Sequence, residues 1–348
     1  MNSIFEHADF DGHESVTLLH DKTSGLHGVV AVHSTALGPA AGGTRFWHYV
    51  SAADGITDAL RLSRAMSLKN AMAGIPHGGG KGVILRPHGE FDRAAIFSAY
   101  GRGLNRIGGA YYTAEDVGVS PQDMTIIRAQ TPFVAGLDEG EAGSGDPSPI
   151  TADGVFRCLK QAVFYKLGKD DLSNITVSIQ GLGSVGYSLA ERLHGAGAKL
   201  IVTDINQDIL KLAKDELNAE VVDPDDIYHV KSDVFAPCAL GGAINLKSIK
   251  ILDTKIVCGA ANNQLANNKM AEALRKRGVL YCPDYIVNGG GIINVASELS
   301  GTYDLDWVYG KLDELVATLG RVISESDNTG KSTDEIAEKI ALSRILNA

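Results

Sequence analysis

The sequence predicts an α/β protein of two domains, a first α/β domain and a second Rossmann domain, with a cleft between them. The chain has 348 residues, a length that suits about two domains. Strand-like and helix-like segments alternate along most of it, as α/β folds require. The turn Gly181-Leu-Gly-Ser-Val-Gly186 stands between an apolar strand and a helix, the setting of a dinucleotide-binding unit.

Composition and charge narrow the classes of partner. Hydrophobic residues make up 44% and charged residues 21% of the chain, which is ordinary for a globular protein. The formal net charge is −10, and the sequence has no basic cluster. We therefore expect no nucleic-acid or membrane partner and a small-molecule ligand instead.

The cysteines and histidines predict no metal site. The four cysteines lack a C-x-x-C pair and have apolar neighbours, so we expect buried, reduced thiols: Cys158, Cys238, Cys258 and Cys282. No His-x-x-x-His pair occurs to bind zinc on a helix. The start, Met1 to His13, is polar and acidic and no long apolar span follows, so we expect a cytoplasmic protein.

The first domain begins with a predicted hairpin. The β-rich runs Ser15 to Leu19 and Leu26 to His33 flank a turn-forming segment that ends at Gly25. The glycine-rich segment Gly38 to Arg45 then predicts a loop, which either turns a corner or brings bare backbone N–H groups against a ligand. Spacing alone does not choose between these two roles.

Capping patterns predict the helices that follow. Ser51-x-x-Asp54 is a capping box for a helix that ends near Gly74 and carries Lys69 near its end. Asp92 caps a second helix, and Ser120 followed by Pro121 caps a third.

Two strands of this domain carry polar residues near their ends. Gly78-Gly-Gly-Lys81 precedes an apolar strand that reaches Leu85, and it lacks the spacing of a Walker P-loop. The strand from Ala110 to Thr113 leads to Asp116. We expect Lys81 at the start of one strand and Asp116 just past the end of the other.

A hinge is predicted at Gly136 to Pro149, where glycines and prolines lie among acidic residues. The predicted domains are residues 1–145, completed by a C-terminal helix at 328–348, and residues 146–327.

The second domain opens with a helix from Thr151 to Gly168 and the strand Ile175 to Ile179. In the turn that follows, Gly181 allows the tight bend, Gly183 lets the backbone approach a pyrophosphate, and Gly186 permits close packing of helix and sheet. The next strand ends at Asp204, about twenty residues on, where a carboxylate accepts hydrogen bonds from a ribose and repels a 2′-phosphate. This pattern favours NAD over NADP, although a doubly wound linkage without a ligand has similar glycines.

Further short apolar strands alternate with helical patterns after Asp204: Val234 to Ala236, Ile256 to Cys258 and Val279 to Tyr281. Loops that bind ligands follow such strands at their carboxyl ends. The candidates there are Cys238, Ala239, Ala260, Asn262, Asn263 and Asn288. Two more helices are predicted, Asp306 to Glu325 and one that Ser332 caps.

Hydride chemistry needs groups that hold the substrate and move its protons, and the candidates are Lys69, Lys81 and Asp116. Burial of Lys81 away from water would lower the pKa of its amine toward neutrality. The like charge of a nearby Lys69 would lower that pKa as well. Composition alone favours a plainer interpretation, in which Lys69 is a solvated helix residue, Lys81 a charged strand edge and Asp116 a turn or cap residue.

The order of these motifs resembles one family. The segments concerned are Gly38 to Arg45, Lys69, Gly78 to Lys81, Thr113 to Gly118, Gly145 to Thr151, Gln180 to Gly186, Phe235 to Gly242, Gly259 to Gln264 and Pro283 to Tyr285. They resemble the Glu/Leu/Phe/Val amino-acid dehydrogenases over nearly the whole chain. Ala114-Glu-Asp116 and Asp146 to Pro149 are most similar to the leucine-specific, branched-chain members.

The resemblance implies NAD-dependent, reversible oxidative deamination of leucine, valine or isoleucine by a homo-oligomer whose first domain binds substrate and mediates oligomerisation. It implies that Lys81 activates water and Asp116 exchanges protons with the amine. Substrate binding is implied for Lys69, Gly42, Gly43, Asn263, Ala41, Ala114, Ile292 and Val295. Cofactor binding is implied for Gly181, Gly183, Ser184, Val185, Gly186, Asp204, Thr151, Cys238, Ala239, Ala260, Asn262 and Asn288.

Two departures from the family pattern leave alternatives open. Asn288 precedes three glycines where Asn-Ala-Gly-Gly is usual, so we expect a more flexible loop there. Ala41 stands where leucine-specific members carry leucine, so an aromatic, phenylalanine-type dehydrogenase is an alternative. A non-catalytic NAD-sensing protein would not need Lys69, Lys81 and Asp116 together. A 2-hydroxy-acid dehydrogenase would need a histidine base, yet no histidine follows His229.

Overall fold

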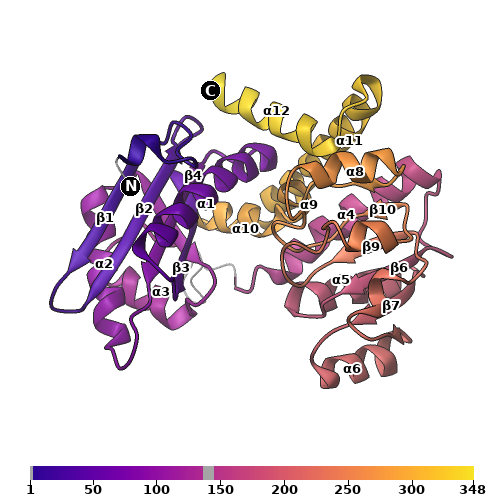
Figure 1. Ribbon diagram of the computed structural model, residues 1–348, viewed down its shortest axis with the longest axis horizontal. Coiled ribbons are helices and arrows are strands. Elements are labelled where there is room, and N and C mark those ends of the chain that lie inside the picture. The colour runs from indigo at the N-terminus through magenta and orange to yellow at the C-terminus, as the bar shows by residue number, and fades with distance from the viewer. Residues whose placement is uncertain (1–2, 136–144) are drawn as a thin grey trace. The chain divides into compact units, whose positions relative to one another are not determined.

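The computed structural model describes residues 3–135 and 145–348 (Figure 1). The chain forms two compact units, the first made of Met1–Asp146, Asn294–Trp307 and Ala341–Ala348 and the second of Pro147–Ile293 and Val308–Ile340. Most of the hinge expected at Gly136 to Pro149 lies outside the described residues.

These units differ from the domain limits expected from the sequence in the C-terminal part of the chain. Residues 328–340 group with the second unit, where the Thr333 hydroxyl donates to the carbonyl of Tyr281 at 2.6 Å. Only the end of the chain groups with the first unit, where Arg344 Nη1 donates to the carbonyl of Ala71 at 2.7 Å. The boundary between the units therefore falls inside one continuous helix, which its sequence pattern did not indicate.

The first unit contains a mixed sheet of five strands, β1 (Ser15–Asp21), β2 (Leu26–Ser34), β3 (Ala40–Trp47), β4 (Gly78–Leu85) and β5 (Tyr111–Glu115). Their order is β1-β2-β4-β3-β5. The pairs β1–β2 and β2–β4 are antiparallel, whereas β3 pairs in parallel with both β4 and β5. The predicted hairpin is confirmed, and β3 lies between β4, which carries Lys81, and β5, which Asp116 directly follows.

Helices α1 (Ala52–Ala73), α2 (Arg93–Ile107) and α3 (Pro121–Arg128) follow the predicted caps, and the short 3-10 helix η1 (Ile4–Glu6) precedes β1. Capping boxes form at Ser51 and Ser120, and the Asp92 side chain accepts from the backbone N–H of Ala95. Val83, Val29 and Leu60 pack on the α1 side of the sheet. Tyr100 and Tyr111 belong to the larger core that includes α2.

Gly38 to Arg45 does not form the expected loop, because most of it is strand β3. Its small residues are required by close packing between strands. An added Cβ at Gly42 would lie 2.0 Å from the carbonyl oxygen of Gly80, and one at Gly43 would lie 2.4 Å from that of Glu115. The glycines thus allow β3 to fit between β4 and β5.

The glycines before Lys81 are also part of a strand, so Lys81 lies within β4 and not at its start. A Cβ at Gly79 would lie 2.1 Å from the backbone nitrogen of Ser67 on α1. A Cβ at Gly82 would lie 2.0 Å from the hydroxyl of Tyr100. These contacts come from elements distant in sequence, which explains why local spacing misplaced the start of the strand.

The second unit is built on a parallel sheet of six strands, β6 (Thr176–Gln180), β7 (Lys199–Thr203), β8 (Glu220–Val221), β9 (Val234–Pro237), β10 (Ile256–Val257) and β11 (Leu280–Tyr281). The order β11-β10-β9-β6-β7-β8 is that of a doubly wound Rossmann sheet, with its topological switch point between β6 and β9. The predicted strands are confirmed with small changes at their ends.

The remaining helices follow in chain order: α4 (Ser148–Leu167), α5 (Ser184–Gly195), α6 (Gln207–Leu217), η2 (Asp226–Tyr228), α7 (Ser248–Ile251), α8 (Lys269–Lys276), α9 (Asp284–Val287), α10 (Gly290–Leu299), α11 (Leu305–Thr329) and α12 (Thr333–Leu346). Helix α4 starts at Ser148, slightly before the start expected at Thr151. The cap predicted for the last helix is confirmed, because the Ser332 hydroxyl accepts from the backbone N–H of Glu335 at 3.3 Å.

The prediction of a flexible loop after Asn288 is wrong, because helix α10 begins at Gly290. A Cβ at Gly290 would lie 2.5 Å from the carbonyl oxygen of Ile150, and one at Gly291 would lie 2.9 Å from Oγ1 of Thr151. The glycine run therefore permits the start of α10 to pack against α4. The expected flexibility is replaced by close helix packing.

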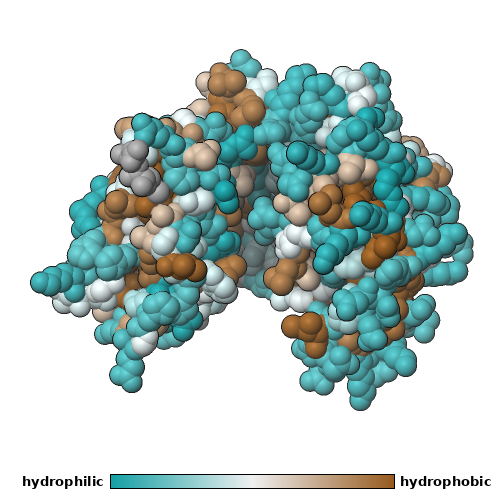
Figure 2. All heavy atoms as spheres, viewed as in Figure 1, coloured by the Kyte–Doolittle hydropathy of each residue, from teal (hydrophilic) through white to brown (hydrophobic). Residues whose placement is uncertain are grey.

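Hydrophilic residues cover much of the face shown in Figure 2, with apolar residues scattered among them. Within residues 3–135 and 145–348, no helix is both long and apolar enough to cross a membrane.

Candidate functional site

The polar centre of the first unit is an ion pair between Lys81 and Asp116. Lys81 Nζ lies 2.8 Å from Asp116 Oδ2, and the side chains are 7% and 23% exposed. Lys81 lies on β4 and Asp116 directly follows β5, so the intervening strand β3 fixes the distance between them. Two of the residues singled out from the sequence are thus brought together by the sheet.

Arg45 on β3 completes this centre, and the sequence did not single it out for chemistry. Its Nε donates to Asp116 Oδ2 at 3.0 Å, and its Nη1 donates to Asp58 Oδ2 at 2.9 Å. The β3–β5 register pairs Thr44 with Glu115 and so places Arg45 beside Asp116. Only a register prediction for β3 and β5 would have found this contact.

Burial sets the charge properties of the ion pair. Burial lowers the pKa of Lys81 below its usual value, against the opposing attraction of Asp116. Burial raises the pKa of Asp116, but the charges of Lys81 and Arg45 outweigh this effect and hold that pKa below its usual value. The site therefore combines an ionised carboxylate with an amine that loses its proton more readily than an exposed lysine.

A buried tyrosine hydroxyl supports the backbone around Lys81. Tyr111 donates to the carbonyl of Gly42 at 2.6 Å and accepts from the backbone N–H of Gly82 at 2.9 Å. It therefore bridges β3 and β4 beside Lys81. Burial raises the pKa of Tyr111 to about 12, so the hydroxyl keeps its proton and its donor role.

The predicted substrate residues divide between the two units. The first unit contains six of them, Lys69, Gly42, Gly43, Ala41, Ala114 and Val295, and the second contains Asn263 and Ile292. The strand registers pair Gly43 with Ala114 and Ala41 with Tyr112. Because side chains alternate along a strand, Ala41 and Ala114 lie on one face of the sheet.

Helix α1 presents Lys69 next to a residue that holds β3 and β4. Asn70 Nδ2 donates to the carbonyl of Gly78 at 2.6 Å and of Ala41 at 3.3 Å. These bonds fix the end of α1, and with it Lys69, to the two strands. The substrate-binding roles of Lys69, Asn263 and the apolar residues stay predictions.

The glycine-rich turn in the second unit has the geometry that a dinucleotide requires. Gly181 has a φ of 96°, and an added Cβ at Gly186 would lie 2.1 Å from the carbonyl oxygen of Gly181. A Cβ at Gly183 would meet no described atom within 4 Å. The first and third glycines are therefore needed by the fold, whereas the second leaves space in front of the backbone.

That space belongs to a cavity of about 500 Å³. Its lining includes Leu182, Gly183 and Ser184 at the start of α5, together with Asp204 after β7. The N-cap of α5 is Gly183, which makes no side-chain cap, and the positive end of the helix dipole lies beside the cavity. Asp204 accepts from the backbone N–H groups of Leu182 at 2.6 Å and Asn206 at 2.8 Å, and each carboxylate oxygen keeps a further lone pair.

Other predicted cofactor residues gather at the carboxyl edge of β6, β9 and β10. The backbone N–H of Cys238 donates to the carbonyl of Gln180, and a Cβ at Gly181 would lie 2.7 Å from the Cβ of Ala239. Asn288 Nδ2 donates to the carbonyl of Ala260 at 3.1 Å and to Asn262 Oδ1 at 2.9 Å.

The Asn288 amide also offers an acceptor. Its Oδ1 is buried and has no hydrogen-bond partner among the described residues. An unpaired buried acceptor costs free energy, so this atom suits a ligand that donates, such as the carboxamide of a nicotinamide. Thr151, in the first turn of α4, donates to the carbonyl of Pro147 at 2.9 Å. The edge of the sheet and the glycine turn together fit a dinucleotide.

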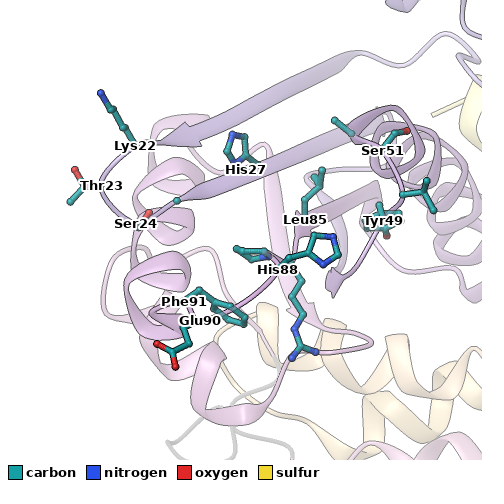
Figure 3. Close-up of a pocket in the computed structure, with 15 residues that line it drawn as sticks. Lys22, Thr23, Ser24, His27, Tyr49, Ser51, Leu85, His88, Glu90 and Phe91 are labelled. Carbon is teal, nitrogen blue, oxygen red and sulfur yellow. The ribbon is translucent and has the colours of Figure 1, made fainter.

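A second cavity, of about 620 Å³, lies in the first unit (Figure 3). Its walls include Tyr49, Leu85, His88 and Phe91, and neither Lys81 nor Asp116 lines it. Across the described part of the chain, no group of three or more His, Cys, Asp or Glu side chains is placed to hold a metal ion.

Comparisons with known proteins show the family to which the chain belongs. Residues 13–133 match the Glu/Leu/Phe/Val dehydrogenase dimerisation domain, and residues 201–346 match the Glutamate/Leucine/Phenylalanine/Valine dehydrogenase domain. Leucine dehydrogenase of Bacillus cereus is 43% identical over 98% of this chain and 93% of its own. Valine dehydrogenase of Streptomyces coelicolor is 42% identical over 100% of this chain and 96% of its own.

A solved structure of an amino-acid dehydrogenase is also similar to this chain. L-tryptophan dehydrogenase from Nostoc punctiforme superposes with a TM-score of 0.86 and 38% identity, over 97% of this chain and 96% of its own. The fold and these relatives define the class of the protein, a nucleotide-dependent oxidoreductase. The chain belongs to the Glu/Leu/Phe/Val dehydrogenase family and is an amino-acid dehydrogenase, and its dimerisation domain supports an oligomeric assembly.

Proposed function

We propose that this protein catalyses the NAD-dependent, reversible oxidative deamination of a branched-chain L-amino acid, namely leucine, valine or isoleucine, to its 2-oxo acid and ammonia. The observation that carries the proposal is the buried pair of Lys81 Nζ and Asp116 Oδ2, 2.8 Å apart. The names of the leucine and valine dehydrogenase relatives support the substrate class.

The proposed roles follow from the charges of the pair. When bound, NAD accepts the hydride that leaves the amino-acid Cα. Lys81 in its neutral form takes a proton from the water that adds to the imine carbon, and a lowered lysine pKa makes that form available. Asp116, held ionised, carries protons to and from the nitrogen until ammonia leaves.

Substrate binding in this proposal uses Lys69 and the backbone of Gly42 and Gly43, with Asn263, as a clamp for the substrate carboxylate. Ala41, Ala114, Ile292 and Val295 surround the apolar side chain. The preference for NAD comes from Asp204, whose carboxylate accepts from ribose hydroxyls and repels a 2′-phosphate.

The deciding experiment measures NADH formation with a panel of branched-chain, aromatic and acidic L-amino acids, each also assayed with NADP. The proposal requires the highest kcat/KM for a branched-chain substrate with NAD. An aromatic substrate is the second candidate, favoured by the small Ala41 and by the similarity to a tryptophan dehydrogenase. A protein that binds NADH but oxidises no amino acid would instead be a non-catalytic sensor.

A further inference from the structure

The Asp116 carboxylate is held by two cations on one oxygen. Lys81 Nζ lies 2.8 Å and Arg45 Nε 3.0 Å from Asp116 Oδ2. Lys81 is needed for proton transfer in the proposed function, so its bond to Asp116 must change during turnover. Arg45 has no such requirement, and its guanidinium stays charged at every working pH.

Arg45 is itself fixed at its other end. Its Nη1 donates to Asp58 Oδ2 at 2.9 Å, and the Tyr49 hydroxyl donates to the same oxygen at 2.5 Å. Burial raises the pKa of Tyr49, so this hydroxyl remains a donor. Asp58 lies on α1, Arg45 on β3 and Asp116 beyond β5. The chain of bonds therefore ties the carboxylate to three separate elements.

These contacts form a series of hydrogen-bonded side chains that starts in the wall of a surface cavity and ends at the Lys81–Asp116 pair. Its members are Tyr49, Asp58, Arg45 and Asp116. Tyr49 is one of the residues labelled in the cavity of Figure 3. Side-chain exposure along the series is 26% for Asp58, 23% for Arg45 and 23% for Asp116. At such partial burial, charged hydrogen bonds are stronger and less screened by salt than those of exposed pairs.

We propose that Arg45, anchored by Asp58 and Tyr49, is the positioning residue that orients Asp116 and sets the charge balance of the Lys81–Asp116 pair. This inference rests on the proposed roles of Lys81 and Asp116. Two directed donors, Nε and Nη1, connect two carboxylates at once, which the single ammonium of a lysine does not reproduce. Arg45 acts through Asp116 and needs no contact with substrate.

The charge of Arg45 has a measurable consequence. It opposes the protonation of Lys81 and so contributes to the lowered pKa of that lysine, and it also keeps Asp116 ionised. Removing the charge in Arg45→Gln raises both pKa values. The acid limb of the pH profile for deamination then moves to higher pH, by about one unit if the effect is typical of a close charge.

The test compares Arg45→Gln, Arg45→Lys, Asp116→Asn and the double variant Arg45→Gln/Asp116→Asn. We expect Arg45→Gln to lower kcat about 10-fold to 100-fold and to change the KM for the amino acid less. The acid limb of its pH profile should move to higher pH. Arg45→Lys keeps the charge and should keep the limb near its native pH while kcat falls. In the Asp116→Asn background, Arg45→Gln should lower kcat little further, because the orienting effect of Arg45 acts through Asp116.

Arg61→Gln is the matched control. Arg61 lies on α1, as Asp58 does, and forms an ion pair with Asp9 at 2.8 Å, but its side chain is 65% exposed. This variant should keep the native kcat and pH profile. Thermal unfolding of every variant separates a loss of folding from a loss of Asp116 orientation. If Arg45→Gln does not fold, Asp58→Asn replaces it, and this variant should lower kcat less than Arg45→Gln.

Each outcome supports or overturns the positioning role. A native kcat and pH limb in Arg45→Gln, or an equal loss in Arg61→Gln, overturns it. A full, independent loss for Arg45→Gln in the Asp116→Asn background overturns it as well. Near-native activity of Asp116→Asn contradicts the proposed function instead, so the two failures are distinguishable.

Discussion

Lys81 Nζ lies 2.8 Å from Asp116 Oδ2 across strand β3, and this pairing joins the two residues to which the proposed mechanism assigns proton transfer. Both side chains are largely withdrawn from solvent, with exposed fractions of 7% and 23%. The geometry of the pair places constraints on activity, on pH dependence and on the response to substitution.

Replacing either member should remove most of the catalytic rate. We expect Lys81→Ala and Asp116→Asn each to lower kcat for deamination by a factor on the order of 10² or more, because general acid–base steps contribute about that much. NADH affinity, measured by fluorescence titration, should remain near native, since both residues lie in the first unit. Most of the activity surviving in Lys81→Ala at every pH would contradict the mechanism.

The pH profile should report the lowered pKa of Lys81. A base acts when neutral, so kcat/KM for deamination should rise with pH through this pKa, which lies below the usual lysine value of about 10.4. Asp116 attracts the charged lysine, so Asp116→Asn should move the remaining acid limb to lower pH. This direction is opposite to that expected for Arg45→Gln. A shift of both variants in the same direction would mean that the limb belongs to another group.

The carboxylate clamp predicts a binding defect. Lys69→Ala should mainly raise the KM for the amino acid, because a clamp acts in both the ground state and the transition state. Steady-state kinetics with saturating NAD measures this change. A collapsed kcat with native KM would move Lys69 from binding to chemistry.

Cofactor preference should depend on Asp204. Asp204→Ser should weaken NAD binding and relax discrimination against NADP, because the ribose acceptor and the repulsive charge are lost together. Asp204 also accepts from the backbone N–H groups of Leu182 and Asn206. Asp204→Asn removes the charge and keeps one of the two oxygens that accept from that loop, so it is the more conservative variant. An unchanged ratio of kcat/KM for NAD and NADP in both variants would place the ribose elsewhere.

A carboxyl group of the second unit should govern stability near neutral pH. Burial, with the nearby charges of Asp284 and Glu338, raises the pKa of Asp334 to about 7. Because this folded-state pKa exceeds the unfolded value of 3.8, the group's contribution to stability is fully present below the unfolded pKa and is lost as pH rises to about 7.

Asp334→Asn should therefore increase the free energy of unfolding at pH 8 by roughly 1–3 kcal/mol, with a smaller gain at pH 5. Urea denaturation at the two pH values measures this. Equal effects at both pH values would show that Asp334 does not titrate in this range.

The sequence by itself determined the elements whose signals are local. The Ser51 and Ser120 capping boxes, the β1–β2 hairpin and the glycine turn at Gly181 each form within a few residues, so their residues predict them directly. The order of motifs also led to Lys81 and Asp116 through family resemblance.

Only the tertiary structure decided the secondary structure at positions where close contact with a residue distant in sequence requires glycine. The sequence predicts loops or the start of a strand at Gly42, Gly79 and Gly290, yet these residues lie in strands and a helix. Glycine is required at each position because a Cβ would meet the Gly80 carbonyl, Ser67 or the Ile150 carbonyl. Arg45 was missed for the same reason. Its partners Asp58 and Asp116 come from other elements, and strand register, which single-residue patterns do not encode, brings them together.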